Sequence, residues 1–246
     1  CILIWEPVIF FFPFFLAIEI INYNCKNIKE ILIHRIYIFI PSIIIAFYII
    51  FNPITVENHE IMKNYLKINF NENCYMSCSL LISKSTIYQQ FNPLSKYSFE
   101  VVIRYILIMV IGFGPLLYLS HFSKLKLKKI FFFDKFKSLL IPLIILLSPI
   151  ILLFAMGYDW GRWVNISYVF SNLFYFYLYK NNMISIKILY PTFLKKIINN
   201  KKLFLAIFII FCFGWNQKTA ITGDVASFPG YRIPVKIINK VLFDRY

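Results

Sequence analysis

A short polar stretch, DWGRW, separates two hydrophobic runs and carries the residue types best suited to chemistry. Asp159 and Arg162 are three positions apart, a spacing that lets their side chains pair on a helical turn. A carboxylate held there could act as a general base toward a hydroxyl group. A guanidinium could bind phosphate through two parallel hydrogen bonds, which an ammonium group cannot form. We therefore predict Asp159 and Arg162 as catalytic residues.

The same stretch allows a purely structural interpretation. Gly157 and Gly161 could relax the backbone into a tight turn, and the ion pair would then neutralise itself. Trp160 and Trp163 flank the charges, and aromatic residues of this kind anchor helices at the headgroup level of a membrane. The sequence leaves the structural and the functional interpretation open.

Composition identifies the class of protein that must position this stretch. The chain has 246 residues, of which 60% are hydrophobic, 20% aromatic and only 15% charged. Soluble domains usually carry about 25% charged residues. Several apolar runs approach the roughly 20 residues that a helix needs to cross a bilayer. We predict an all-α, polytopic transmembrane bundle that has membrane lipid as a partner.

Six membrane spans are predicted within a single transmembrane domain. An outer loop over 52–100 and an outer tail over 216–246 accompany them, and apolar spacing predicts short interfacial helices in these outer parts. The chain begins inside an apolar run without a methionine, which suggests a fragment or a processed chain. The predicted spans cover 6–21, 35–51, 101–122, 138–157, 163–179 and 203–215.

Basic residues set the predicted orientation, because cytoplasmic loops accumulate lysine and arginine. The three loops that follow the first, third and fifth spans are all lysine-rich, so alternation places both chain ends and the DWGRW stretch outside. Arg104, Arg162 and Arg232 would then also lie outside, where the rule disfavours them, which suggests an anion bound at the outer face. Arg104 could instead extend its side chain to the interface. The lysines lie beside spans, so attraction to anionic lipid explains them and we predict no nucleic-acid partner.

The cysteines form no metal-binding or redox motif. Cys74 and Cys78 are four apart in the outer loop, so a disulfide is conceivable in an oxidising compartment, although helical spacing is not ideal for one. Two ligands are too few for a typical zinc site, so we predict no metal site. The chain also lacks a phosphate-binding glycine loop and a serine-hydrolase motif, and we predict no cofactor.

At GYDWGRWVNISYVFSNLFYF the chain resembles the bacterial integral-membrane polymerases of surface polysaccharides, the O-antigen and oligosaccharide repeat-unit polymerase group. Asp159, Gly161 and Arg162, with the flanking Trp160 and Trp163, carry the resemblance. It implies a multi-pass protein of the bacterial inner membrane, of which this chain would be the C-terminal part, and a polyprenyl-pyrophosphate-linked oligosaccharide as substrate.

The resemblance also implies glycosyl transfer at the extracytoplasmic face without a metal ion. Arg162 would stabilise the pyrophosphate leaving group, and Asp159 would activate the acceptor hydroxyl. Arg104, Trp160, Trp163 and Arg232 are the predicted substrate-binding residues. Protein partners are not indicated by the sequence.

Two other functions fit the same composition. A transporter or flippase fragment would need ionisable residues near mid-membrane and helices interrupted by glycine, and only Glu6 and the GFGP segment at 112–115 qualify. A non-catalytic membrane assembly subunit is the second alternative.

Overall fold

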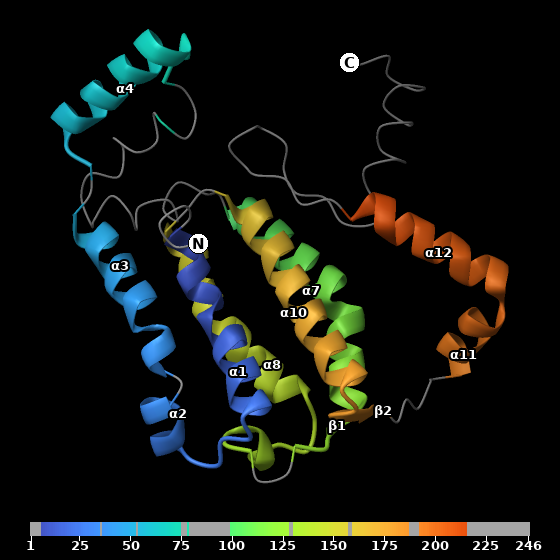
Figure 1. The fold of residues 1–246 in the computed structure, drawn as a ribbon. Helices are drawn as coiled ribbons and strands as arrows, with labels where there is room; N and C mark the ends of the chain where they lie inside the picture. Colours follow the sequence, from blue (N-terminus) through green and yellow to red (C-terminus); the bar gives the residue numbers. More distant parts are fainter. Residues whose placement is uncertain are drawn as a thin grey trace, which may run out of the picture.

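A computed structural model describes residues 6–34, 36–52, 54–74, 78, 99–127, 130–156, 159–186 and 192–215. The described chain is mostly helical, with one short two-stranded sheet (Figure 1). The predicted all-α class is therefore confirmed. The predicted tail over 216–246 and most of the second half of the predicted outer loop lie outside the described residues.

The elements follow the chain in three groups. The first contains η1 (Glu6–Phe11), α1 (Phe12–Asn22), α2 (Ile28–His34), η2 (Ile36–Ile38), α3 (Ile40–Phe51) and α4 (Val56–Phe70). The second contains α7 (Phe99–Phe122), β1 (Ser123–Leu125), η4 (Phe133–Lys135), α8 (Leu140–Leu147), η5 (Ser148–Ile150) and α9 (Ile151–Met156). The third contains α10 (Trp160–Lys180), β2 (Ile184–Ile186), α11 (Thr192–Asn199) and α12 (Lys201–Gly214).

Prolines mark where several of these helices start or break, because proline lacks the N–H that an interior turn needs. Pro13 and Pro41 occupy the first positions of α1 and α3, where that N–H would be unpaired anyway. Pro149 lies in η5, the 3-10 turn that interrupts the predicted span 138–157 between α8 and α9. Pro115 lies inside α7, which continues through it.

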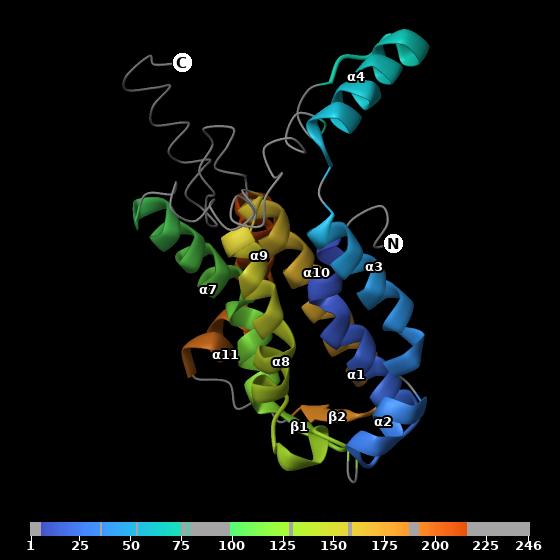
Figure 2. The same cartoon turned by 90° about the vertical axis from the view of Figure 1, so that its left-hand side faces the viewer.

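Helices α1, α7, α8, α9 and α10 form the packed part of the molecule, and they run side by side in both views (Figures 1 and 2). Phenylalanines join α1 to α10: Phe11 stacks on Phe170 with ring centroids 4.8 Å apart, and Phe14 meets Phe174 at 5.8 Å. On the other side of α10, Phe113 of α7 contacts Tyr168 at 5.5 Å. The core is thus built around α10, which contacts the other four helices.

The three lysine-rich loops meet at one end of this bundle. Phe131 N–H donates to the Cys25 carbonyl at 2.7 Å, which joins the first loop to the second. Strands β1 and β2 pair antiparallel, Lys124 opposite Ser185, which joins the second loop to the third. The sheet and α2 lie at this end, whereas α4 and the start of α10 lie at the opposite end (Figure 2). Sequence analysis had predicted the three loops on one side but no strand.

By length and composition, one described helix could cross a membrane alone, Val101–Phe122 within α7. A second candidate arises if Ile28–Ile38 and Ile40–Ile49, which meet at 62°, count as one bent span. Val8–Asn22 and Leu140–Ala155 are apolar but shorter. Within the described residues, helices occupy most of each of the six predicted ranges, but six spans remain a prediction.

Trp215, directly after α12, packs against α7 through a close contact at a glycine. Its indole Nε1 donates to the Ile108 carbonyl at 3.2 Å, and its ring meets Tyr168 at 4.6 Å. A Cβ atom on Gly112 would lie 2.1 Å from the Trp215 ring, whereas one on Gly114 would meet nothing within 4 Å. The absence of a side chain at Gly112 is therefore required for this contact.

We predict that Gly112→Ala displaces Trp215 and destabilises the protein by about 1–3 kcal/mol, the usual range for overpacking. The measurement is thermal unfolding of the purified protein in detergent, followed together with indole fluorescence. Gly114→Ala is the matched control on the same helix and should unfold like the wild type. If the effect of Gly112→Ala persists in a Trp215→Ala background, this contact is not its cause.

Candidate functional site

The predicted catalytic pair lies at the first turn of α10. Asp159 is the N-cap residue, and its carbonyl accepts hydrogen bonds from the N–H groups of Arg162 at 2.9 Å and Trp163 at 3.1 Å. The Asp159 side chain makes no capping hydrogen bond and instead contacts Arg162, with Oδ2 3.0 Å from Nη1. Helix α10 therefore begins at Trp160, ahead of the predicted 163, and Gly161 is buried in its first turn instead of relaxing a loop. Gly157 lies outside the described residues.

The ion pair is accessible from outside the protein. The Arg162 side chain is 59% exposed and that of Asp159 is 25% exposed. Exposed ion pairs contribute at most about 1 kcal/mol, because solvent screens them and both side chains lose rotational freedom. Folding alone therefore gives little reason for this pair, and its guanidinium remains accessible to an anionic ligand.

Trp160 and Trp163 are buried, so neither faces outward as a residue of an aromatic belt would. Trp160 Nε1 donates to the Phe154 carbonyl at 2.8 Å, which satisfies a carbonyl in the last turn of α9. Its ring also meets Tyr105 of α7 edge-on at 5.0 Å. Trp160 follows Asp159 in the chain and contacts both α7 and α9. These contacts position the first turn of α10, which carries the ion pair. A direct contact of either indole with substrate stays a prediction.

The side chains of the other predicted substrate-binding residues lie outside the described part of the structure. Arg104 is in α7, beside Tyr105, but its side chain is outside the described part. Arg232 lies in 216–246, which is also outside the described residues. Glu6 begins η1, and its side chain is likewise not described.

An apolar cavity of about 290 Å³, open to the surface on one side and not predicted from the sequence, lies between α7, the α8–α9 segment and α10. Met109 and Phe113 line it from α7, Ile151 and Phe154 from α9, and Val164 from α10. One lining residue connects the cavity to the first turn of α10, because the Phe154 carbonyl accepts a hydrogen bond from Trp160 Nε1.

The serine hydroxyls on the buried face of α10 bond within the helix, so they do not make the wall of the cavity polar. Ser167 lines the cavity, yet its hydroxyl donates to the Trp163 carbonyl of the same helix at 2.5 Å. Ser171 donates in the same way to the Ser167 carbonyl at 2.7 Å. Because these hydroxyls are satisfied within α10, the cavity suits a hydrocarbon chain.

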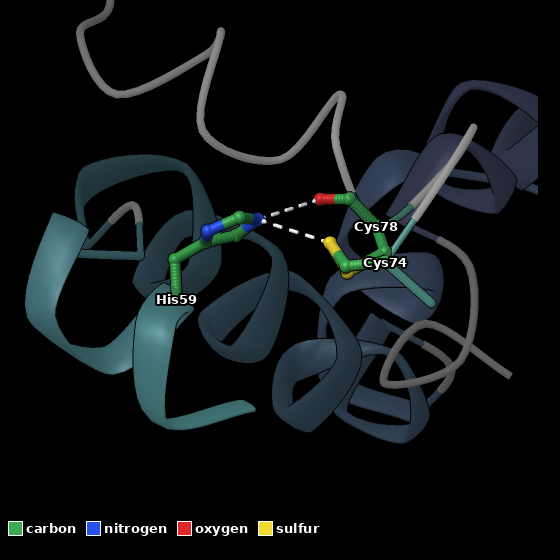
Figure 3. Close-up of side chains that lie close together, drawn as sticks. All are labelled: His59, Cys74 and Cys78. Atoms are coloured by element: carbon green, nitrogen blue, oxygen red, sulfur yellow. Dashed lines mark hydrogen bonds between the residues drawn. A yellow bond between two sulfur atoms is a disulfide. The ribbon is translucent and has the colours of Figure 1, made fainter. Parts of the chain in front are cut away.

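A second cluster of reactive side chains is formed by α4 and the chain that follows it, away from the ion pair. Cys74 and Cys78 form the disulfide that the sequence left open, and His59 lies against them (Figure 3). Sequence analysis missed His59. In the sequence, His59 is only a histidine 15 residues before Cys74. Its contact with the disulfide depends on how the chain folds back after α4, which the sequence pattern does not reveal.

The chain was compared with known protein families, curated proteins and solved structures, and it matches none of them. The resemblance around Asp159 and Arg162 is therefore neither supported nor contradicted by a relative. Function has to be argued from the geometry of the site.

The two parts of the site should differ in their contribution to stability. We predict that Trp160→Phe lowers the free energy of unfolding by about 1–3 kcal/mol, because it leaves the Phe154 carbonyl without its donor. Arg162→Gln should cost at most about 1 kcal/mol, because it removes only an exposed ion pair. Thermal unfolding in detergent measures both, and a larger loss for Arg162→Gln would contradict this division.

Proposed function

We propose that the chain belongs to an integral membrane protein that transfers glycosyl groups at the extracytoplasmic face of the bacterial inner membrane. Its substrate is a polyprenyl-pyrophosphate-linked oligosaccharide, as in surface polysaccharide polymerisation. One observation carries the proposal: an accessible guanidinium, paired with a carboxylate, lies at the first turn of α10, and α10 also lines an apolar cavity together with α7 and α9.

Exposed apolar side chains support a membrane location. Soluble proteins rarely expose large continuous apolar surfaces, because the hydrophobic effect disfavours them in water. On α12 nearly every residue is exposed, and α7 and α10 bury one face and expose apolar side chains on the other. These exposed residues include Ile106, Leu107, Val110, Val169, Leu173, Phe176, Phe204, Leu205, Phe208, Ile209 and Ile210.

The meeting of three lysine-rich loops at one end supports the proposed orientation, with that end cytoplasmic. Six spans would then place both chain ends and the Asp159–Arg162 pair outside. The shorter and bent helices could still cross the bilayer, since tilting, local thinning of the bilayer and packing against neighbouring helices accommodate such segments.

The ligand that fits these features has an anionic head and an apolar tail. The guanidinium of Arg162 offers several N–H donors in a planar fork that matches two phosphate oxygens. The apolar cavity between α7, α9 and α10 would hold the first isoprenoid units of the lipid. A free sugar phosphate would use the first feature and leave the second without a role, so the lipid-linked form is favoured.

In the proposed reaction, an acceptor hydroxyl oxygen attacks the anomeric carbon and the bond to pyrophosphate breaks. Arg162 stabilises the negative charge that develops on the leaving pyrophosphate, and Asp159 accepts the proton of the hydroxyl. Binding of pyrophosphate would draw the guanidinium away from Asp159, which frees the carboxylate to act as a base. Until substrate binds, Arg162 and Asp159 therefore contact each other, and bound pyrophosphate would replace the carboxylate as the partner of Arg162.

We predict that Arg162→Lys and Asp159→Asn each abolish long-chain polysaccharide in the native host while the protein stays at normal membrane levels. Lysine keeps the charge but loses the planar fork, and asparagine keeps the shape but loses basicity. The measurement is gel analysis of surface polysaccharide from cells that carry the full-length gene, with blotting for the protein.

The control is the ion pair between Glu60 and Lys63 on α4, which has the same i,i+3 spacing, an N–O distance of 3.3 Å and a carboxylate more exposed than that of Asp159. Glu60→Gln and Lys63→Gln should leave the polymer unchanged. Normal polymer in both Asp159→Asn and Arg162→Lys would refute the proposed roles and favour a transport or assembly function. Loss of the protein itself would assign the pair to folding.

The cavity provides a separate prediction. Val164→Phe should fill part of it and reduce polymer length or yield, because the lipid would lose space in the cavity. Val169→Phe is the control on the same helix, since Val169 is exposed and does not line the cavity. Equal polymer from both variants at equal protein levels would exclude the cavity as the lipid site.

A further inference from the structure

The cluster on α4 brings three potential metal ligands into one small volume. His59 Nε2 lies 3.5 Å from Cys74 Sγ, and the ligand atoms of His59, Cys74 and Cys78 all lie within 4.8 Å of one another (Figure 3). His59 is buried, with 5% of its surface exposed, and its Nδ1 has no hydrogen-bond partner among the described residues. An imidazole nitrogen close to two cysteine sulfur atoms is a donor set that thiophilic metal ions such as Zn²⁺ bind.

Local structure holds this arrangement in place. Thr55 caps α4 by accepting a hydrogen bond from the Asn58 N–H at 3.2 Å, which fixes the first turn that carries His59. At the other end, Asn71 adopts a left-handed conformation with φ 53°, which ends the helix. The chain then runs back along α4, since Cys74 reaches His59 although about 17 Å of helix separates His59 from the end of α4.

We propose that His59, Cys74 and Cys78 form a Zn²⁺ site when the disulfide is reduced. A tetrahedral zinc ion has Zn–S distances of about 2.3 Å and Zn–N distances of about 2.0 Å, which separate N and S by about 3.5 Å. His59 Nε2 and Cys74 Sγ already have this separation. After reduction the two sulfur atoms would lie about 3.8 Å apart in the complex, which rotation of the cysteine side chains can supply. A water molecule would occupy the fourth position.

The disulfide and the metal complex exclude each other, because only a thiolate is a ligand. Reduction by a protein dithiol of the same compartment breaks the S–S bond, gives two thiols on this chain and oxidises the donor to its own disulfide. Binding Zn²⁺ then releases the two thiol protons. In the disulfide state His59 Nε2–H donates to the Cys78 carbonyl at 2.9 Å, and in the zinc complex this bond is replaced as the ring proton moves to Nδ1. The cluster is thus a metal site controlled by thiol oxidation.

The site is independent of the Asp159–Arg162 pair. Helix α4 lies beyond the packed bundle in both views (Figures 1 and 2). Loss of the metal site therefore says nothing about the proposed glycosyl transfer, and each can fail alone.

The test uses the full chain, purified in detergent, and Co²⁺ as the probe. The disulfide is reduced with a phosphine, which adds no competing thiol, and a thiol count verifies the reduction. We then expect one Co²⁺ per chain, with the intense visible bands of a tetrahedral thiolate complex. Zn²⁺ should displace it. The oxidised chain should bind none. Loss of even an outer-shell partner weakens metal binding about 10- to 100-fold, so His59→Gln should weaken it at least about 100-fold.

Matched controls separate the site from the remaining cysteines and histidines. His121→Gln and Cys212→Ser should bind Co²⁺ like the wild type, because neither residue belongs to the cluster. Cys74→Ser and Cys78→Ser should each weaken Co²⁺ binding and reduce the sulfur-to-cobalt absorption by at least half, because one of the two thiolates is lost. Equal binding by the His59→Gln variant, binding by the oxidised chain, or no binding after verified reduction would each overturn the proposal.

Discussion

The burial of one face of α10 is the constraint on which the rest of the structure depends. From Trp160 to Leu178 this face packs against α1, α7, α8 and α9, so every other helix of the packed bundle is placed relative to it. Phenylalanines supply much of the contact with α1, and aromatic pairs prefer offset or edge-on geometry, which restricts how the helices can slide. The position of α10 in turn decides where its first turn, and therefore the ion pair, emerges.

In the candidate site, one set of residues positions the helices and a different set would carry out the chemistry. Buried groups do the holding: the Trp160 indole satisfies the Phe154 carbonyl and packs on Tyr105. Accessible groups would do the chemistry, since Arg162 and Asp159 contribute little to folding. Such a division lets the charged groups change partners during a reaction without loosening the helices beneath them.

Sequence reasoning succeeded where one local pattern decides the structure. Apolar runs predicted helices over the ranges of α7, α10 and α12, and the i,i+3 spacing predicted the contact between Asp159 and Arg162. It failed where distant segments meet. The burial of Trp160, the cavity between three helices and the pairing of β1 with β2 all depend on tertiary packing, which no periodicity in the chain encodes. His59 was missed for the same reason, because its cysteine partners come from a segment that folds back.

The small sheet has a mechanical consequence for the site. Strand β1 follows α7 directly and β2 follows α10 closely, so their pairing clamps these two helices together at one end. A relative tilt of α7 and α10 must then pivot at this clamp, and the displacement it produces grows with distance along the helices. It is largest at the far end, where Tyr105 meets Trp160 and the ion pair lies. The sheet is therefore the pivot, and relative motion of α7 and α10 displaces the Asp159–Arg162 pair more than it displaces the strands.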